Sequence, residues 1–344
     1  MDFWKLKYHE YLNTEGDVII EGSDFLRSKI LKELDPKAYS ISFSDWVENR
    51  KQTLRDYLSD SILEIRGNEA RLNLLAKAVS YERVVPFVGA GLSMSSGLPS
   101  WTSFLWLLQS ESHVSADSLD TLLSNGEYEK AAQLLYEDLG SNLFNKHLQE
   151  CFDKQNDIEG AINFLPFLFP KQNIITTNFD KILEKIFLTN QGFDQILMGD
   201  KLEEAFRLMA QGGRFLCKIH GTCDALTNRV LIEKEYIQLY EQTGLLRRFL
   251  ERLITNNTLL FLGCSLTSDR TIKIIEDITN ENGGMPLPQH YAFLELSDGI
   301  DKIERQKVLA KANIFPIWYP EGEHNESIEA LLLALIEMNE INLG

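Results

Sequence analysis

The chain has 344 residues, of which 44% are hydrophobic, so it can bury a substantial core as one large or two modest domains. Its 51 acidic residues outnumber its 34 Lys and Arg residues, and the formal net charge of −17 disfavours direct binding to nucleic acid or to an anionic membrane. Because the sequence contains neither an apolar run of about 18 residues nor a signal-peptide pattern, we expect a cytoplasmic protein without a membrane span.

The charged first part of the chain predicts a mainly helical N-terminal extension, residues 1–80, ahead of a main domain at 81–344. Within the extension, a short strand is expected at 17–21 and helices at 23–34 and 44–65. In the second helix, Leu54, Leu58, Ile62 and Ile65 share one face. This face predicts docking either on the main domain or on another subunit.

From residue 84 onward, short apolar segments alternate with longer segments of helical periodicity, which is typical of a parallel sheet covered by helices. We predict an α/β fold with a doubly wound, Rossmann-like parallel sheet of about six strands. The strands are expected at 84–88, 173–177, 214–219, 258–263, 290–294 and 314–318. The helices are expected at 128–139, 180–188, 201–209, 245–254, 268–278, 301–312 and 325–338. The segment 280–289, with two Gly and two Pro, predicts a flexible connector.

The first strand of the main domain runs into Gly89, Ala90, Gly91 and, two positions later, Ser93. Glycines let backbone N–H groups approach an anion closely, and a following helix adds the positive end of its dipole. The turn therefore favours a phosphate site, although a tight strand-to-helix turn would use the same glycines. The spacing departs from the dinucleotide-binding fingerprint, because the next glycine, Gly97, comes late.

Three further strands end in polar residues. Asn178 and Asp180 follow one of them, where they suit either a ligand or a turn and a helix cap. His220 follows another strand, and it suits the role of an acid, of a base or of a structural residue. Gly263 and Ser265 follow a third, where Ser265 suits a phosphate or ribose oxygen or a helix cap. Because the carboxyl ends of parallel strands meet at one edge of a sheet, this convergence predicts one ligand site.

Four motifs in order, GAGLSMSSGLPSW, TTNFD, KIHGT and FLGCSLTSD, resemble the sirtuin superfamily of NAD-consuming enzymes. They are most similar to the sirtuin-like NAD hydrolases of bacterial antiphage defence. The resemblance spans residues 84–266 and implies a doubly wound NAD-binding domain, with its adenine-side region near 317–323.

The resemblance also implies roles for individual residues. The catalytic residues would be His220, as the base, and Asn178, which would position a water or the ribose hydroxyls beside the nicotinamide. The substrate-binding residues would be Gly89, Ala90, Gly91 and Ser93 at the phosphates, Asp180 at the nicotinamide ribose and carboxamide, and Gly263 and Ser265 on the adenosine side. Trp101 and Trp106 suit either the wall of this pocket or the core.

The chain departs from the protein-deacylating sirtuins in three respects. Those enzymes carry Gln where it has Thr177, Asp-Phe-Arg at 100–102, and a zinc module of two Cys-x-x-Cys pairs, which its four scattered cysteines cannot form. We therefore expect reduced cysteines, no metal, and an NAD glycohydrolase that releases nicotinamide and ADP-ribose. The alternatives are a protein deacylase, an ADP-ribosyl transferase, and a non-catalytic sensor of NAD or ADP-ribose.

An unregulated NAD hydrolase would be toxic to its own cell. The resemblance therefore implies a regulated effector that depletes NAD during antiphage defence, by abortive infection. Its control is expected to come from the N-terminal extension, from homo-oligomers, or from a separate partner such as a sensor protein or a nucleotide-driven ATPase.

Overall fold

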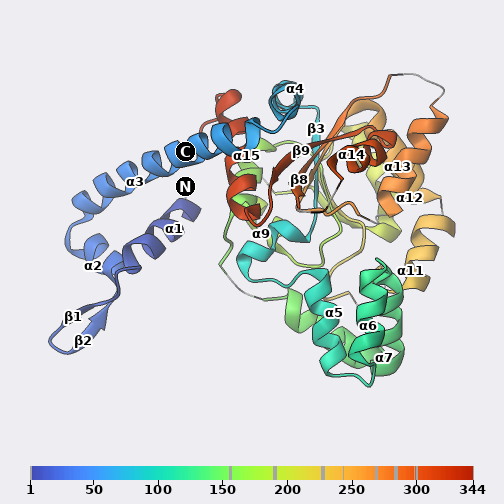
Figure 1. Ribbon diagram of the computed structural model, residues 1–344, viewed down its shortest axis with the longest axis horizontal. Coiled ribbons are helices and arrows are strands. Elements are labelled where there is room, and N and C mark those ends of the chain that lie inside the picture. The colour runs from blue at the N-terminus through green and yellow to red at the C-terminus, as the bar shows by residue number, and fades with distance from the viewer. Residues whose placement is uncertain are drawn as a thin grey trace.

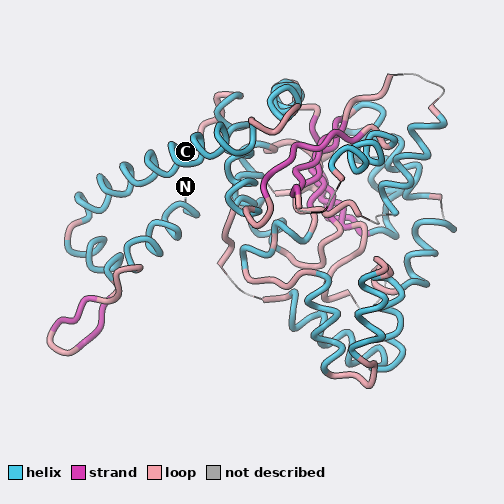
Figure 2. Tube along the Cα trace, viewed as in Figure 1, coloured by secondary structure: helices cyan, strands magenta, loops and turns pink. Residues whose placement is uncertain are grey.

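The computed structural model describes residues 2–154, 157–188, 192–225, 229–242, 244–267, 270–282, 286–297, 299 and 301–343. Within these residues, a seven-stranded sheet lies at the centre of the main domain, and helices cover both of its faces (Figures 1 and 2). All neighbouring strands in it are parallel. The predicted α/β, Rossmann-like architecture is confirmed.

The sheet has the strand order β5-β6-β4-β3-β7-β8-β9. Its members are β3 (Val84–Val88), β4 (Ile174–Thr176), β5 (Gln195–Met198), β6 (Phe215–Lys218), β7 (Thr258–Leu262), β8 (His290–Leu296) and β9 (Ile314–Pro320). The six predicted strands are present, and β5 is an addition at one edge. Because β4 lies on one side of β3 and β7 on the other, the order reverses between β3 and β7. Open α/β sheets bind ligands at the carboxyl ends of strands beside such a switch point.

Alternate residues of the strands enter two different cores, as the period of two in a strand requires. In β3, Val84 and Val88 join the core on one face of the sheet, and Val85 and Phe87 join the core on the other. The first core includes helices α4 (Asn68–Ser80), α8 (Leu165–Leu168), α9 (Ile182–Leu188) and α15 (His324–Met338). The second includes α10 (Leu202–Gln211), α12 (Leu245–Asn256), α13 (Arg270–Glu281) and α14 (Lys302–Lys311).

The predicted helices that correspond to α9, α10, α12, α13, α14 and α15 agree with them to within a few residues, whereas α4 and α8 were not predicted. The expected start at residue 268 lies outside the described residues, as do residues 283–285 of the predicted connector, whose first residues instead extend α13. The remaining short elements are η2 (Ala90–Leu92), η3 (Met94–Ser96), η4 (Ala161–Phe164), η5 (Gly199–Lys201), α11 (Glu233–Ile237) and η6 (Gln238–Gln242). Of these, η6 is a π-helical turn.

A helical module is inserted between β3 and β4, and it lies below the sheet in Figure 1. It consists of α5 (Trp101–Ser110), α6 (Ala116–Ser124) and α7 (Tyr128–Phe152), which share a core of their own. The predicted helix at 128–139 is the first part of α7, which is interrupted at Gly140 by a positive φ of 75°. Trp106 packs against the core of this module.

The N-terminal extension consists of α1 (Asp2–Asn13), the hairpin β1 (Val18–Ile20) and β2 (Ser23–Phe25), α2 (Arg27–Leu34), α3 (Pro36–Tyr57) and the π-helical turn η1 (Leu58–Leu63). The helix predicted at 23–34 begins only at Arg27, because 23–25 pair with β1. Leu54 and Ile62 are fully buried in the first core, so the predicted apolar face docks on the main domain of the same chain. The predicted boundary between residues 1–80 and 81–344 stays a prediction.

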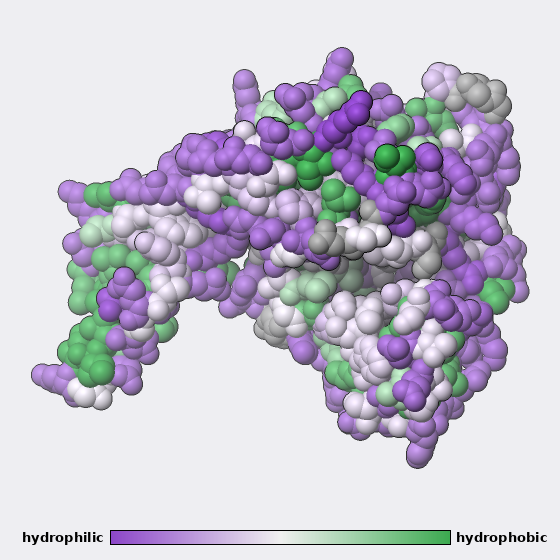
Figure 3. Space-filling view, in the orientation of Figure 1, coloured by the Kyte–Doolittle hydropathy of each residue, from purple (hydrophilic) through white to green (hydrophobic). Residues whose placement is uncertain are grey.

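Ion pairs join this extension to α15. Glu329, which is 1% exposed, accepts Lys7 Nζ at 2.5 Å and Arg50 Nη2 at 2.9 Å. Arg50 also forms a bidentate pair with Glu326, with distances of 2.7 and 2.6 Å. Beyond these contacts, the hairpin projects from the molecule (Figure 1), and apolar residues such as Ile19 gather on its surface (Figure 3). None of the described helices has the length and apolar character needed to cross a membrane.

Candidate functional site

A cavity of about 850 Å³ opens at the carboxyl ends of the strands, where the sheet meets the helical module. Every residue that the sequence analysis assigned to the site lines this one cavity: Gly89, Ala90, Gly91, Ser93, Asn178, Asp180, His220, Gly263 and Ser265. They follow β3, β4, β6 and β7, so the expected convergence of four strand ends is present. Trp101 also lines the cavity, as do Trp318 and Tyr319 from the segment expected near the adenine.

The turns after β3 and β7 touch each other at the switch point. Gly89 N–H donates to Leu262 O at 2.8 Å, and Gly91 N–H donates to Gly263 O at 2.9 Å. A Cβ atom on Gly89 would lie 2.6 Å from Gly263 O, and one on Gly91 would lie 2.9 Å from Gly263 Cα. The glycines are thus required for the close approach of two turns. Their own N–H groups are used inside the protein, so they differ from the anion donors that the sequence suggested.

Ser93, Asn178 and Asp180 form a buried hydrogen-bonded chain. Ser93 Oγ donates to Asp180 Oδ2 at 2.8 Å and accepts from Asn178 Nδ2 at 3.1 Å. Asp180 Oδ1 accepts the N–H of Ile182, the first residue of α9, at 2.9 Å. Asp180 therefore caps α9, which is one of the two roles that its sequence position suggested. It also orients Ser93, another residue of the cavity.

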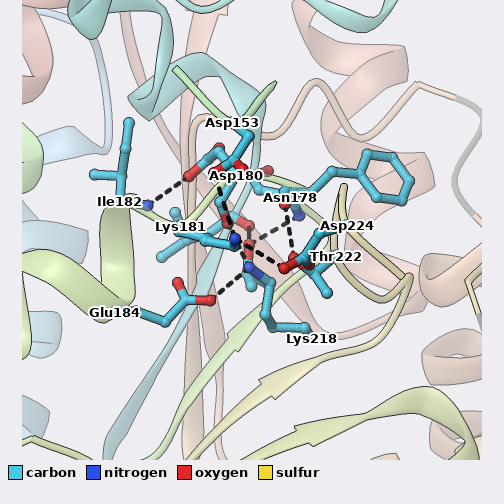
Figure 4. A network of polar contacts seen from close by, with 12 residues as sticks. Asp153, Asn178, Asp180, Lys181, Ile182, Glu184, Lys218, Thr222 and Asp224 are labelled. Carbon is cyan, nitrogen blue, oxygen red and sulfur yellow. Dashed lines mark hydrogen bonds and ion pairs between the residues drawn. The ribbon is translucent and has the colours of Figure 1, made fainter. Parts of the chain in front are cut away.

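Lys218, the last residue of β6, contacts the turn after β4 that carries Asp180 (Figure 4). It is 1% exposed, and its Nζ donates to the backbone oxygen of Asp180 and, at 2.8 Å, to Glu184 Oε1. Next to it, Lys181 pairs with Asp224 at 2.8 Å. Sequence reasoning missed Lys218, although a lysine inside an otherwise apolar strand was a visible signal.

His220 is 8% exposed and is surrounded by aromatic rings. Its ring centroid lies 5.0 Å from that of Tyr236 and 6.4 Å from that of Phe179. Its Nε2 is 2.8 Å from the hydroxyl of Tyr240. Burial lowers the pKa of His220 from 6.5 to about 3, so the imidazole is neutral near pH 7.

A second histidine, His324 at the start of α15, also lines the cavity. Its Nε2 is 3.2 Å from Gly91 O, which can only accept, so Nε2 carries the proton. Its Nδ1 then accepts from the Tyr319 hydroxyl at 2.7 Å. Burial lowers the pKa of His324 and raises that of Tyr319. Tyr319 belongs to the segment expected near the adenine, whereas His324 was not predicted, because it lies one residue beyond that segment.

Arg270 joins the helical module to the main domain at the cavity wall. Its Nε and Nη2 donate to Glu129 of α7 at 2.8 and 2.5 Å, and its Nη1 donates to Glu241 of η6 at 2.5 Å. Its guanidinium also lies 5.9 Å from the ring centroid of Tyr236. Hydrogen bonding to Glu129 raises the pKa of Arg270. This contact was not predictable, since it connects helices far apart in the sequence.

The described part of the chain contains no group of three or more His, Cys, Asp or Glu side chains placed to hold a metal ion. Its cysteines Cys151, Cys217, Cys223 and Cys264 are not joined by disulfide bonds. Cys264 lines the cavity, next to Gly263.

Comparison with known protein families gives a match to the SIR2-like domain over residues 172–317. That range includes Asn178, Asp180, His220, Gly263 and Ser265, and it leaves out the glycine turn after β3.

Among curated proteins, the chain is similar to the NAD(+) hydrolase ThsA of Cytobacillus dafuensis, with 25% identity over 68% of this chain and 45% of that protein. ThsA of Enterococcus faecium is 25% identical over 59% of this chain and 41% of the relative. Defense-associated sirtuin 2 of Bacillus subtilis is 24% identical over 54% of this chain and 18% of the relative. The chain thus spans less than half the length of each of these relatives.

Proposed function

We propose, from the premise that residues 172–317 are a SIR2-like domain, that this protein hydrolyses the bond between nicotinamide and ribose in NAD⁺. The observation that carries the proposal is the meeting of Asn178, Asp180 and His220 with the crossed glycine turns in one cavity at the switch point. The similarity to two proteins named NAD(+) hydrolases supports the same reaction.

The reaction consumes NAD⁺ and water and yields nicotinamide, ADP-ribose and a proton. The C1′–N bond breaks with its electron pair passing to the pyridinium nitrogen, which becomes neutral. The anomeric carbon develops positive charge, and the water oxygen forms the new bond to it. Because the leaving group departs as a neutral molecule, the protein needs to supply orientation and electrostatic stabilisation more than acid catalysis.

Asn178 and Asp180 suit the first two requirements. Since Asn178 Nδ2 is bonded to Ser93, its Oδ1 is the atom available to accept a hydrogen bond from water or a ribose hydroxyl. The carboxylate of Asp180 lines the cavity and would favour the positive charge that develops on the sugar.

His220 would accept the proton of the attacking water or of a ribose hydroxyl. An imidazole whose pKa is about 3 is a weak base. It still suffices here, because water that is bonding to a cationic carbon becomes far more acidic than bulk water. The role of His220 as the base therefore fits an attack that follows the departure of nicotinamide.

The rest of the substrate would occupy the cavity beyond these residues. Ala90 and Ser265 lie beside the crossed glycine turns, where the pyrophosphate and the adenosine would be held. Arg305 supplies a positive charge at the cavity wall, where its Nη2 donates to Ser265 O at 2.8 Å.

The biological role that we propose is the depletion of NAD in antiphage defence, which the name of Defense-associated sirtuin 2 supports. Such an activity requires control, and homo-oligomers, a sensor or ATPase partner and the N-terminal extension are the proposed means. The ion pairs of Lys7 and Arg50 with Glu329 connect the extension directly to α15, which carries His324.

Incubation of the purified protein with NAD⁺, followed by chromatography of nicotinamide and ADP-ribose, tests the reaction. Wild type and a His113→Ala control, altered at an exposed histidine of the helical module, should release equal amounts of both products. His220→Ala and Asn178→Ala should release neither while remaining folded. Thermal stabilisation by NAD⁺ without release by any variant would favour a sensor, and absence of both would overturn the assignment.

A further inference from the structure

Within the described residues, the imidazole of His220 is held at its Nε2, by a residue that was not selected in the sequence analysis. Its Nε2 lies 2.8 Å from the hydroxyl of Tyr240, while its Nδ1 has no hydrogen-bond partner among the described residues. The rings of Tyr236 and Tyr240 stack with centroids 5.7 Å apart beside it. The ring of His220 is therefore fixed in place with Nδ1 as the nitrogen left for a ligand.

Tyr240 itself is held by a third group. Its hydroxyl lies 3.2 Å from Thr271 Oγ1, and Thr271 is completely buried near the start of α13. Tyr240 lies on the π-helical turn η6, and such turns often mark functional sites. The residue after Tyr240 and the residue before Thr271 also meet, because Arg270 donates to Glu241 at 2.5 Å. Two adjacent contacts thus fix the register of η6 against α13.

A tyrosine hydroxyl has a single proton, so these contacts allow two arrangements. If Tyr240 donates to Nε2, His220 carries its proton on Nδ1 and presents a donor to the cavity. If Tyr240 donates to Thr271, Nε2 carries the imidazole proton and Nδ1 presents a lone pair. Only the second arrangement lets His220 take a proton from a nucleophile.

We propose that Tyr240 and Thr271 are positioning residues that keep the proton of His220 on Nε2 and so turn the lone pair of Nδ1 toward the substrate. This inference deepens the proposed hydrolysis and rests on it for its catalytic consequence. During the reaction, the proton of the nucleophile passes to Nδ1, and the imidazolium that forms donates from Nε2 to the Tyr240 oxygen. Tyr240 thereby acts through His220 without contacting the substrate, as the third member of an oriented catalytic set does.

The test reads the imidazole nitrogens directly by ¹⁵N NMR of histidine-labelled protein, with the signals of His220 assigned from their loss in His220→Asn. In wild type without NAD⁺, we expect a pyrrole-type Nε2 and a pyridine-type Nδ1. Tyr240→Phe removes only the hydroxyl and should give a mixture of tautomers. Thr271→Val removes the acceptor of the Tyr240 proton and should shift His220 toward the Nδ1-protonated form.

Kinetics then connect the tautomer to catalysis. Tyr240→Phe should lower kcat for nicotinamide release by about 10- to 100-fold and change KM for NAD⁺ by less than about threefold. The matched control is Tyr291→Phe, which removes a hydroxyl bonded to Gln289 on a buried tyrosine that does not line the cavity. It should leave kcat and the His220 signals unchanged.

A wild-type protein with its proton on Nδ1, or a Tyr240→Phe protein with an unchanged tautomer and kcat, would overturn the inference. A simple loss of packing would instead lower the melting temperature without moving the ¹⁵N signals. Because these signals are recorded without substrate, they decide the positioning role even if wild type releases no nicotinamide. In that case it is the proposed hydrolysis that fails.

Discussion

The hydroxyl of Ser93 donates to Asp180 Oδ2 across 2.8 Å and so joins the turn after β3 to the turn after β4. The same oxygen accepts from Asn178, and Ser93 is only 3% exposed. Its donor is therefore already used inside the protein. In the proposed reaction, Ser93 would orient Asn178 and Asp180 more than it would hold a phosphate.

The first prediction concerns Ser93→Ala. Removal of the hydroxyl leaves a buried carboxylate oxygen of Asp180 without this donor, so the free energy of unfolding should fall by about 1–3 kcal/mol. Urea unfolding measures that loss, and kcat for nicotinamide release should fall about tenfold as Asn178 loses its partner. Ser110→Ala, on the exposed end of α5, is the control. A rise in KM with unchanged kcat would instead show that Ser93 binds the substrate.

The second prediction separates stability from activity at Lys218. Lys218→Met leaves Glu184 without its partner and should lower the free energy of unfolding by about 3 kcal/mol, since breaking a buried ion pair strands a charge. Lys218→Met combined with Glu184→Met should recover most of that loss in urea unfolding. The double variant should still have a low kcat for nicotinamide release, because the backbone oxygen of Asp180 still lacks the hydrogen bond from Lys218. Recovery of both properties would limit Lys218 to a structural role.

The third prediction tests the crossed turns. Gly263 has a φ of 67°, and a Cβ atom there would lie 2.5 Å from Leu92 N, so Gly263→Ala should prevent the two turns from meeting. Gly212→Ala is the matched control, because φ is 71° there and nothing lies within 4 Å of the added Cβ. Gly212→Ala should lower the free energy of unfolding by about 1 kcal/mol through backbone strain alone. Gly263→Ala should lower it by more and should abolish binding of NAD⁺. Equal costs in thermal unfolding would contradict the steric argument.

The fourth prediction is acid destabilisation by His290, which lies on β8 and accepts the Leu259 N–H at Nδ1. Burial lowers its pKa from 6.5 to about 3, so the unfolded chain binds a proton that the folded chain rejects as the pH falls between these values. Stability is thus fully present above pH 6.5 and decreases below it, by about 2 kcal/mol at pH 5 for this residue.

His290→Asn keeps an acceptor for the Leu259 N–H and removes the titration. Urea unfolding at pH 7.5 and pH 5 should therefore show a smaller loss for this variant than for wild type. His113→Asn, at an exposed histidine, should behave as wild type does. An equal loss in all three proteins would mean that His290 is protonated in the folded state.

The fifth prediction is a pH–rate profile. With a lowered pKa of about 3, His220 is already deprotonated throughout the range from pH 5 to pH 9. The value of kcat for nicotinamide release should therefore stay nearly constant across that range, without a rise near pH 6.5. Such a rise in wild type, absent from His324→Gln, would place the titrating group at the other histidine of the cavity.

The strands were predictable because most of them are buried on both faces and read as short apolar runs. β5 is the exception: it is a four-residue edge strand, and its Ile196 is 48% exposed. The helices α5 and α6 were missed for another reason, since they belong to a module with its own small core and carry no strand pattern beside them. The predicted helix at 23–34 lost its first residues to a hairpin, a pairing that local periodicity does not encode.

The candidate site was predictable where topology alone determines position. Residues that directly follow parallel strands must meet at one edge, and all those selected on this basis line the cavity. Tyr240, Arg270 and His324 come instead from helices, and their approach to the cavity depends on how those helices pack. No spacing rule in the sequence connects Tyr240 to His220. The catalytic and binding roles of the selected residues stay predictions.

The position of α15 has a consequence for synthesis of the protein. His324 of this helix contacts the Gly91 carbonyl, and its Glu329 pairs with Lys7 and Arg50. The helix therefore completes both the cavity and the surface on which the extension packs. A growing chain makes the segment that carries Gly91, Asn178 and His220 well before it makes residues 314–338. Until those residues leave the ribosome, the turn at Gly91 lacks its histidine and the extension lacks its carboxylates. The cavity proposed to bind NAD⁺ would thus be complete only after α15 has been synthesised.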